Sequence, residues 1–352
     1  MKKQKVVVGM SGGVDSSVAA LLLKNQGYNV VGMFMNGRCT ADNDYADMRV
    51  VADKIGIPYF TVNYSKQYMD KVFAYFLEEY KKGRTPNPDV LCNREIKFGP
   101  FLKQAKQLGA DYIATGHYCG ILHEEGAHYL LKAADQNKDQ TYFLNQLNQK
   151  QLADVLFPLS DMLKEEVRCI AEQNDLITAA KKDSTGICFI GERNFKNFLK
   201  NYLPMQKGDI IDKNGKIVGE HDGLMYYTIG QRRGLGLGGT SDSQERWFVV
   251  EKDLIQNRLI VSHGDESVLN SYALISNEVN WIPFKPAADT FNCSAKFRYR
   301  QSEQNVKVKI NTDHTVRVDF ETPQRAVTTG QYVVFYDEKK CLGGGVIDEV
   351  IK

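Results

Sequence analysis

Two repeating patterns of apolar and polar residues alternate along the first third of the chain. Short runs rich in β-branched residues, such as Lys5–Val8 and Val30–Met35, are typical of buried strands. The segments between them place apolar residues at helical spacing, as in Gln67–Lys81. Because repeated strand–helix units form parallel sheets covered by helices, we expect a doubly wound α/β fold over residues 1 to about 135. The other expected strands are Tyr59–Asn63 and Asp111–Gly116, and the other expected helices are Ser16–Asn25, Tyr45–Lys54 and Lys97–Leu108.

The pattern changes twice in the remainder of the chain. Three helices are expected first, at Gln149–Leu156, Lys164–Asn174 and Asn194–Tyr202, and Pro204 ends this helical stretch. Glycines then crowd residues 208–239, and short strand-like runs follow at Trp247–Glu251 and Leu259–Ser262. From residue 271 the period-two alternation of short strands predicts a small β-barrel. The expected barrel strands are Asn292–Arg300, Val306–Ile310, Thr315–Phe320, Tyr332–Tyr336 and Gly344–Asp348.

We therefore expect three units. Residues 1–205 form the α/β domain with a helical extension, residues 206–270 a small central β-rich domain, and residues 271–352 a C-terminal β-barrel. A length of 352 residues fits two or three domains, and 43% hydrophobic and 25% charged residues are ordinary for a soluble globular protein.

Composition and charge narrow the function classes. No run approaches the roughly 20 apolar residues of a membrane span, and the N-terminal apolar run meets Gly9 too soon for a signal peptide. Seven dispersed cysteines without a CxxC pair argue against a disulfide scaffold or a simple zinc site, and a reducing cytoplasm fits them best. Because the net charge is only +2, a nucleic-acid partner would have to be bound by local basic patches.

The turn after the first strand carries the clearest chemistry. Gly9, Gly12 and Gly13 allow a tight turn whose backbone amides meet the N-terminus of the next helix, and this combination favours phosphate. Ser16 and the serine after it add hydroxyl donors, while Asp15 could hold a metal ion or fix the turn. The turn has neither the Lys–Ser/Thr pair of a Walker A loop nor a GxGxxG pattern. Its S-G-G-x-D-S order resembles the PP-loop of ATP pyrophosphatases, whereas an ordinary glycine turn would not explain the Asp-Ser-Ser run.

Two cysteines lie in polar, loop-like contexts. Cys92 belongs to TPNPDVLCNREIKF and precedes an expected helix N-terminus, where the pKa of a thiol can fall below about 8.5. Cys188 belongs to KKDSTGICFIGE, where Lys181 and Lys182 supply positive charge. Free cysteines are usually small buried hydrophobes, which is the expectation for Cys119, Cys169, Cys293 and Cys341, while the role of Cys39 stays open.

After the PP-loop come PNPDVLCN, ATGHY, KDQTYFL, KDSTGICFIG, YYTIGQR and KFRYRQ. In this order the motifs resemble those of bacterial tRNA-uridine 2-thiouridylases over nearly the whole chain. The resemblance implies a PP-loop ATP-pyrophosphatase domain, a small central domain and a C-terminal β-barrel. It also implies ATP-dependent thiolation of the wobble uridine at position 34 in tRNAs for Lys, Glu and Gln. The implied cofactors are ATP and its Mg²⁺, with no metal held by protein ligands, and the implied partners are tRNA and a sulfur donor, either a cysteine desulfurase or a sulfur-relay protein.

The same resemblance implies a role for each motif. Cys188 would carry a persulfide, and Cys92 would be the partner thiol in sulfur release. Asn87, Pro88 and Asp89 would surround the target base, with Asp89 as a candidate acid or base whose alternative role is a loop-capping turn. The implied ATP-binding residues are Gly9, Met10, Ser11, Gly12, Gly13, Val14, Asp15, Ser16, Met35 and Gly116. The implied tRNA-binding residues are His117, Lys138, Asp139, Gln140, Arg298, Tyr299 and Gln331.

The chemistry of the reaction agrees with these roles. A uracil C2 carbonyl is a poor electrophile, but adenylation of its oxygen makes AMP the leaving group. Cleaving a persulfide needs a second thiol and ends in a disulfide, so Cys92 and Cys188 must meet. A wobble base is single-stranded and can enter a pocket, and basic–aromatic interleaving suits single-stranded RNA. Such basic segments are Lys296–Arg300, then Lys81, Lys82 and Arg84, and then Arg232 and Arg233.

Alternatives stay open beside this interpretation. An amidating ATP pyrophosphatase would need neither the two loop cysteines nor a basic barrel. An RNA-binding module with a relic nucleotide site would not need an intact SGGVDS, and an iron–sulfur variant is disfavoured because CxxC is absent. The segment after Met35 is shorter than is usual in the family, which leaves open the contacts expected at residues 36–43.

Overall fold

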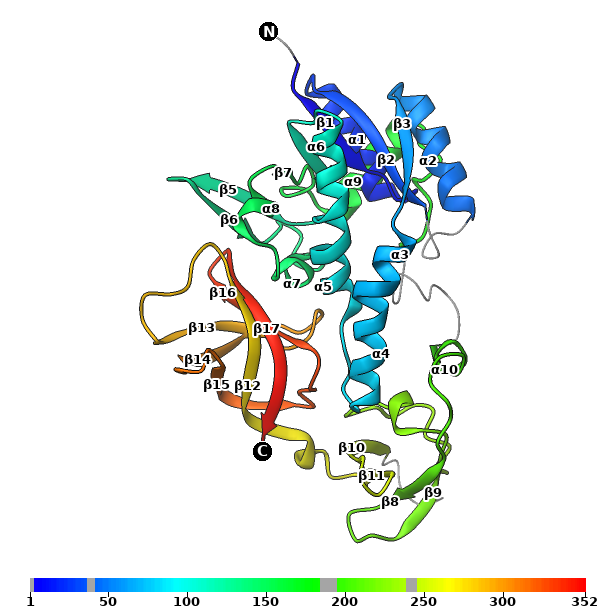
Figure 1. The fold of residues 1–352 in the computed structure, drawn as a ribbon, viewed down its shortest axis with the longest axis vertical. Helices are drawn as coiled ribbons and strands as arrows, with labels where there is room; N and C mark the ends of the chain where they lie inside the picture. Colours follow the sequence, from blue (N-terminus) through cyan, green and yellow to red (C-terminus); the bar gives the residue numbers. More distant parts are fainter. Residues whose placement is uncertain (1–2, 37–41, 184–194, 239–245) are drawn as a thin grey trace.

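The computed structural model describes residues 3–36, 42–183, 195–238 and 246–352. An α/β domain, a small central β domain and a C-terminal barrel are arranged around a long helical segment (Figure 1). The α/β fold with a second β domain and a barrel, expected from the sequence, is confirmed.

The α/β domain is built on a parallel five-stranded sheet with the order β3-β2-β1-β4-β7. β2 and then β3 lie on one side of β1, and β4 lies on its other side. The strand order therefore reverses between β1 and β4, which is where doubly wound sheets bind their ligands. The strands are β1 Lys5–Gly9, β2 Asn29–Asn36, β3 Tyr59–Asn63, β4 Tyr112–Thr115 and β7 Val155–Leu156.

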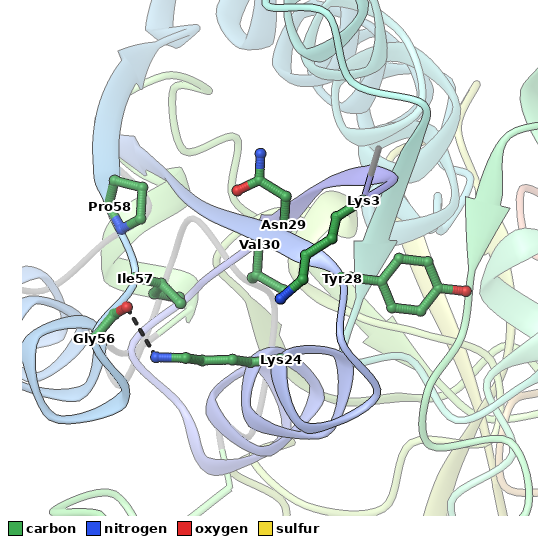
Figure 2. Close-up of a pocket in the computed structure, with 8 residues that line it drawn as sticks. All are labelled: Lys3, Lys24, Tyr28, Asn29, Val30, Gly56, Ile57 and Pro58. Atoms are coloured by element: carbon green, nitrogen blue, oxygen red, sulfur yellow. Dashed lines mark hydrogen bonds between the residues drawn. The ribbon is translucent and has the colours of Figure 1, made fainter. Parts of the chain in front are cut away.

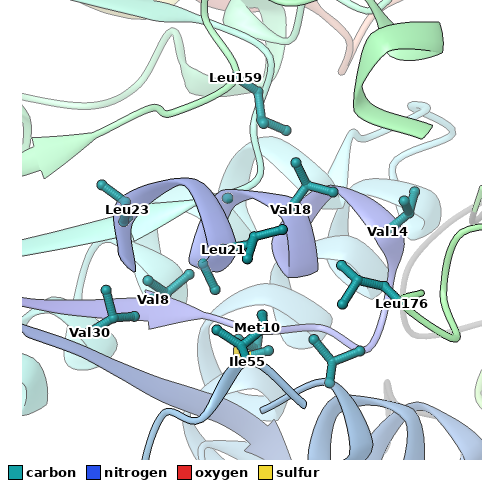
Figure 3. Close-up of a cluster of buried hydrophobic side chains, with 14 of the residues drawn as sticks. Val8, Met10, Val14, Val18, Leu21, Leu23, Val30, Ile55, Leu159 and Leu176 are labelled. Atoms are coloured by element: carbon teal, nitrogen blue, oxygen red, sulfur yellow. The ribbon is translucent and has the colours of Figure 1, made fainter. Parts of the chain in front are cut away.

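Apolar residues of β1 face both sides of this sheet. Val6 and Val8 pack into a cluster with α1, α2 and α9, whereas Val7 packs into the cluster on the opposite face with Phe101 of α6 (Figure 3). Burial on both faces explains why the strand is a continuous apolar run. The helices are α1 Val14–Asn25, α2 Asp42–Ile55, α6 Pro100–Gln107 and α9 Lys164–Gln173.

A long helical segment leads from the α/β domain toward the central domain (Figure 1). The helix expected at Gln67–Lys81 is present, but a π-helical turn interrupts it. Its apolar side, including Val72 and Phe76, packs in one cluster with central-domain residues such as Val249. The pieces are α3 Ser65–Tyr68, η1 Met69–Phe73 and α4 Ala74–Lys81, and a second segment follows as α5 Pro88–Cys92 and η2 Asn93–Lys97.

The central domain is a four-stranded sheet with the order β10-β11-β8-β9. Lys252 of this sheet donates from Nζ to the carbonyl oxygen of Gly83 at 2.9 Å, just beyond the C-terminus of α4. The helix α10 Phe195–Leu199 precedes this domain, whose elements are β8 Gly208–Ile211, β9 Ile217–His221, η3 Leu224–Tyr226, β10 Trp247–Asp253, β11 Arg258–His263 and η4 Glu266–Leu269.

The C-terminal barrel closes because its first strand pairs with two others. β12 pairs with β15 on one side and with β17 on the other, so six strands form a closed ring in the order β12-β15-β14-β13-β16-β17. The strands are β12 Asn270–Trp281, β13 Thr290–Lys296, β14 Gln304–Ile310, β15 Val316–Arg325, β16 Tyr332–Asp337 and β17 Lys340–Ile351.

Two features of the first domain differ from expectation. The hairpin β5 Gly120–Glu124 and β6 Ala127–Leu131 was not expected, and it extends the barrel sheet because β6 pairs with β17. The helix expected at Gln149–Leu156 is wrong in its second half, since α8 ends at Leu152 and β7 then adds a parallel edge strand beside β4. The backbone nitrogen of Ile113 in β4 donates to the carbonyl oxygen of Asp154. The backbone after α8 therefore forms hydrogen bonds with the sheet and does not continue the helix. A further short helix, α7 Thr141–Leu144, precedes α8.

Candidate nucleotide and thiol sites

The loop between β1 and α1 is closed by its own serines. Ser16 accepts a hydrogen bond from the backbone of Ser11 at 3.1 Å and donates to the carbonyl oxygen of Gly13 at 3.1 Å. Ser17 also donates to Gly13, at 2.8 Å. Gly12 has φ +77°, and a Cβ there would lie 2.2 Å from the carbonyl oxygen of Asp44, so both conformation and space require glycine. The loop is therefore pre-formed at the N-terminus of a helix.

The carboxyl end of β4 touches this loop. A Cβ on Gly116 would lie 2.7 Å from the backbone nitrogen of Ser16, so the two backbones are in close contact at the β1/β4 switch point. The structure thus brings together the loop and the ATGHY segment, as expected from the sequence. Met10 and Val14 are buried in the core, so only their backbones can face a ligand (Figure 3).

Asp15 is held by two donors on its side chain. Its Oδ1 accepts a hydrogen bond from the Tyr118 hydroxyl at 2.8 Å and lies 2.6 Å from the Lys164 ammonium. Of the two roles considered for Asp15, metal ligand or fixed turn residue, these contacts favour the second.

Lys164 also reaches the residues that precede Cys188. Its Nζ lies 2.8 Å from Asp183, which accepts further contacts from Lys138 at 2.5 Å and Arg168 at 2.9 Å. Partial burial opposes ionisation, but the hydrogen bonds from Lys138 and Lys164 prevail and lower the pKa of Asp183 to about 2. Asp183 therefore stays ionised as the centre of a cationic cluster beside the phosphate loop.

A second contact ties the same segment to the loop. Lys181 donates from Nζ to the carbonyl oxygen of Gly12 at 2.9 Å and pairs with Asp44 at 2.8 Å and Asp47 at 2.5 Å. Lys181 thus contacts the PP-loop directly at Gly12, whereas Asp183 is connected to it through Lys164, which also contacts Asp15. Cys188 itself lies outside the described residues, as does Cys39.

Cys92 occupies a position different from the one expected. The helix begins at Pro88, where Asn87 accepts a hydrogen bond from the backbone of Asp89 at 3.2 Å, and it continues through Lys97. Cys92 therefore lies inside a helix, and the expectation of a thiol just before a helix N-terminus is wrong. The capping residue is Asn87, and the Asp89 side chain is half-buried beside it.

Cys92 packs in an apolar cluster that reaches the carboxyl edge of the parallel sheet, where the PP-loop lies. Cys92 is 7% exposed in a cluster that includes Leu91 and Phe73. Met35, at the carboxyl end of β2, packs against this same cluster. The carboxyl edge of the sheet thus borders both the PP-loop and the thiol. Four other cysteines were expected to be buried. Cys119 and Cys341 are buried and Cys293 is half-buried, but Cys169 is exposed because it lies on the outer face of α9.

Several residues expected to contact tRNA have internal partners. His117 is buried, with Nδ1 2.7 Å from the Thr115 hydroxyl, and burial together with Lys97 holds its pKa well below 6.5. Asp139 is 3% exposed and accepts from Thr141 at 2.7 Å, and burial raises its pKa. Gln140 accepts from the backbone of Tyr118 at 3.0 Å. Their tRNA contacts stay predictions.

Two of the three barrel residues of the same set contact the α/β domain, and the third contacts the backbone of the C-terminal unit itself. Tyr299 donates to the carbonyl oxygen of Lys138 at 3.5 Å, and Gln331 donates to that of Thr85 at 2.7 Å. Arg298 donates to the carbonyl oxygen of Ala326. Gln331 thereby lies next to the segment that begins with Asn87.

The basic segments are partly neutralised. Lys296 is 8% exposed and lies 4.0 Å from Asp139, and Phe297 is 1% exposed, so the expectation that the basic and aromatic residues of Lys296–Arg300 are available for phosphate contact and stacking is wrong at the first two residues. Arg84 pairs with Glu79 and Asp348, and Arg232 pairs with Glu266.

Three functional candidates were missed from the sequence: Tyr118, Lys164 and Asp183. Asp183 stands in the KDSTG motif, which offered a signal, whereas Lys164 begins an amphipathic helix and offered none.

A cavity of about 350 Å³ lies at the other edge of the sheet (Figure 2). Lys3, Asn29 and Pro58 line it at the amino ends of the strands, and Lys24 donates to the carbonyl oxygen of Gly56 at 2.9 Å. Its position opposite the PP-loop separates it from the nucleotide site.

A serine-closed glycine loop at the switch point of a doubly wound sheet defines a PP-loop nucleotide-binding protein. Residues 4–192 match a family model described as a tRNA methyl transferase HUP domain, residues 196–263 its PRC-barrel domain, and residues 271–347 an aminomethyltransferase beta-barrel domain. Because relatives named tRNA-specific 2-thiouridylase MnmA are 57% and 58% identical to this chain over 100% and 98% of its length, the chain belongs to that family.

Relatives match the chain over its full length. A protein of Alkaliphilus oremlandii named tRNA-specific 2-thiouridylase MnmA is 57% identical over 360 residues, covering 100% of this chain and 99% of that protein. The protein of that name from Enterococcus faecalis is 58% identical over 357 residues, covering 98% and 96%. Among solved structures, an NMN synthetase from Francisella tularensis has a TM-score of 0.37 and 15% identity, covering 56% of this chain and 72% of that chain. None of the helices in the described part of the chain is both long and apolar enough to cross a membrane.

Proposed function

We propose that this chain is an ATP-dependent tRNA-uridine 2-sulfurtransferase that makes 2-thiouridine at wobble position 34, in tRNAs for Lys, Glu and Gln. The observation that carries the proposal is that Met35 joins the cluster of Cys92 to the sheet edge that holds the PP-loop. Family membership over the full length supports the same activity. We assign residues 1–205, 206–270 and 271–352 to its three domains, and we place the enzyme in the cytoplasm.

The first step is activation of the base. The loop from Gly9 to Ser16 holds the phosphates of ATP, while Met35 and Gly116 line the adenosine side. The C2 oxygen of uridine attacks the α-phosphorus, pyrophosphate leaves, and the oxygen becomes part of an AMP leaving group. The ammonium groups of Lys164 and Lys181, both within 3 Å of loop atoms, offset the charge of the phosphates. Mg²⁺ bound to ATP would neutralise part of the phosphate charge, with phosphates and water as most of its ligands.

The second step delivers sulfur. A sulfur donor leaves a persulfide on Cys188, whose terminal sulfur attacks C2 and expels AMP. The thiolate of Cys92 then attacks the Cys188 sulfur, and the bond between that sulfur and the sulfur on C2 breaks. The sulfur on C2 keeps the electron pair and becomes the thiocarbonyl of 2-thiouridine. A Cys92–Cys188 disulfide forms, which external thiols must reduce. Asn87, Pro88 and Asp89 hold the base, and Asp89 is the candidate for proton transfer.

The test is nucleoside analysis of tRNA after incubation with protein, ATP and a persulfide source. Cys188→Ser should abolish 2-thiouridine while leaving tRNA binding intact, because only the sulfur carrier is lost. Cys169→Ser is the matched control, since Cys169 is exposed on α9 and should not affect turnover. Full thiolation by Cys188→Ser would contradict the proposal. Pyrophosphate release with ammonia and no tRNA would instead identify an amidating enzyme.

A further inference from the structure

The β5–β6 hairpin presents two histidines beside its turn. Glu125 and Gly126 form the tip with φ +50° and +79°, as a type I′ turn requires, and Glu124 pairs with Ala127. His123 and His128 are the next pair along the hairpin. In Figure 1 the hairpin projects from the body of the molecule.

Backbone hydrogen bonds fix how this pair is oriented. The side chain of Gln149 accepts from the backbone nitrogen of His128 at 2.8 Å and donates to its carbonyl oxygen at 2.9 Å. Because these groups point away from β5, His123 and His128 form a non-hydrogen-bonded pair, in which opposite side chains are closest. The helix α8 that carries Gln149 therefore braces the pair.

The two imidazoles already face each other. Their Nδ1 atoms are 2.7 Å apart and their ring centroids 4.8 Å apart. A contact of this length between two ring nitrogens holds one proton, so at least one ring is neutral. Only a neutral imidazole nitrogen can bind a metal ion.

We propose that His123 and His128 form a surface site for a divalent transition-metal ion, such as Cu²⁺, Ni²⁺ or Zn²⁺. The ion replaces the shared proton, the two Nδ1 atoms are its protein ligands, and water completes its shell. Metal–imidazole bonds of about 2.0–2.1 Å place two adjacent ligand nitrogens about 3 Å apart, close to the 2.7 Å seen here, and both rings must turn so that their Nδ1 atoms point at the ion and not at each other. Imidazole pairs favour Cu²⁺ over Ni²⁺ and Zn²⁺ in intrinsic affinity. The bound ion would cross-link β5 and β6.

Calorimetric titration of the full chain with Ni²⁺ tests the site. Binding should weaken at least about tenfold in His123→Gln and in His128→Gln, because the second imidazole binds as an intramolecular ligand. His314→Asn is the matched control: His314 is an exposed histidine on another turn, with φ +66°, which asparagine tolerates. Unchanged affinity in both hairpin variants would assign the ion to other groups, such as thiols, and overturn the proposal.

A second measurement uses the unmodified protein. Electron paramagnetic resonance of the Cu²⁺-loaded chain should show coupling to two equivalent nitrogens. Coordination by sulfur, or by a single nitrogen, would overturn the proposal even if a variant failed to fold.

Discussion

At the scale of single residues, Lys164 connects two carboxylates that are distant in the sequence. Its side chain is 11% exposed and bridges Asp15 of the PP-loop and Asp183, which precedes the Cys188 segment. Asp183 keeps two other cations, whereas Asp15 keeps only the Tyr118 hydroxyl among its described side-chain partners. Loss of Lys164 should therefore affect the loop more than Asp183.

We predict that Lys164→Met lowers kcat/KM for tRNA-dependent pyrophosphate release about 100-fold, because a preorganised cation beside the phosphates is lost. Lys164→Arg should retain part of the activity. The comparison is Lys54→Met, which removes a surface pair with Asp175 that is 49% and 85% exposed and so contributes little. Pyrophosphate release at the normal rate in Lys164→Met would rule out this role.

The site was predictable where its residues are consecutive or follow strands that end at the same edge of the sheet, as Gly116 does. Gly9 to Ser16 form one turn, so their spacing in the sequence is their spacing in the structure. Lys164 joins them from a helix far along the chain, and nothing in its local pattern indicates which loop it faces. The position of Cys92 was misjudged for a related reason: Asn87 caps a helix that begins at Pro88, so Cys92 lies within the helix and not before it.

At the scale of elements, the central sheet is fastened to the end of α4. Lys252 donates to the Gly83 carbonyl, and a cation at this place is favourable for the helix dipole. A Cβ on Gly83 would lie 2.8 Å from Leu254, so the two elements are also in close apolar contact.

Lys252 should make the free energy of unfolding depend on pH in the alkaline range. Burial lowers its pKa from 10.5 to about 8, so between these values the unfolded chain binds more protons and stability rises with pH. We predict that the wild type gains at most about 3 kcal/mol over this window relative to Lys252→Met, measured by urea denaturation. Lys207→Met, which changes an exposed lysine, should keep the wild-type profile. Parallel profiles for wild type and Lys252→Met would refute the assignment.

A second junction joins the segment after α4 to the barrel. Arg84, with a 19% exposed side chain, lies 2.7 Å from buried Glu79 and 2.5 Å from Asp348 of β17. It also donates to the carbonyl oxygen of Ile347 at 3.1 Å. One guanidinium thus neutralises a buried carboxylate and holds a barrel strand.

Arg84→Met should destabilise the chain by about 3 kcal/mol, because Glu79 is left as a buried charge with an inadequate partner. Denaturant unfolding measures this loss, and adding Glu79→Gln should recover part of it. Lys81→Met, which breaks an exposed pair with Glu78, should cost less than about 1 kcal/mol. Equal losses in the two single variants would show that Glu79 does not need Arg84.

At the scale of the whole molecule, the α/β domain and the barrel share one core. Tyr142 and Leu144 of α7 pack in the same cluster as Tyr332 and Val346 of the barrel. Polar contacts reinforce this core: Asn280 donates to the carbonyl oxygens of Asn145 and Leu147 at 2.8 and 3.0 Å.

Local sequence patterns predicted the strands and helices of each domain, but they did not predict the core that the α/β domain and the barrel share. Alternation in Val306–Ile310 specifies a strand with one buried face, and the strand is present as β14. The hairpin β5–β6 was missed because its turn, Glu125-Gly126, is not the Asn-Gly or Asp-Gly pair that marks a two-residue hairpin, and the apolar residues on either side, Ile121-Leu122 and Tyr129–Leu131, are consecutive and do not alternate with polar ones.

The pairing of β17 bears on how the protein is made. Residues 340–351 follow every strand that β17 joins, namely β6, β12 and β16. Until the ribosome has produced them, β6 keeps an open backbone edge and the ring of strands has a gap. The barrel therefore closes, and β6 gains its partner, only after these residues are translated, so nascent chains carry unpaired strand edges of the kind that favour aggregation.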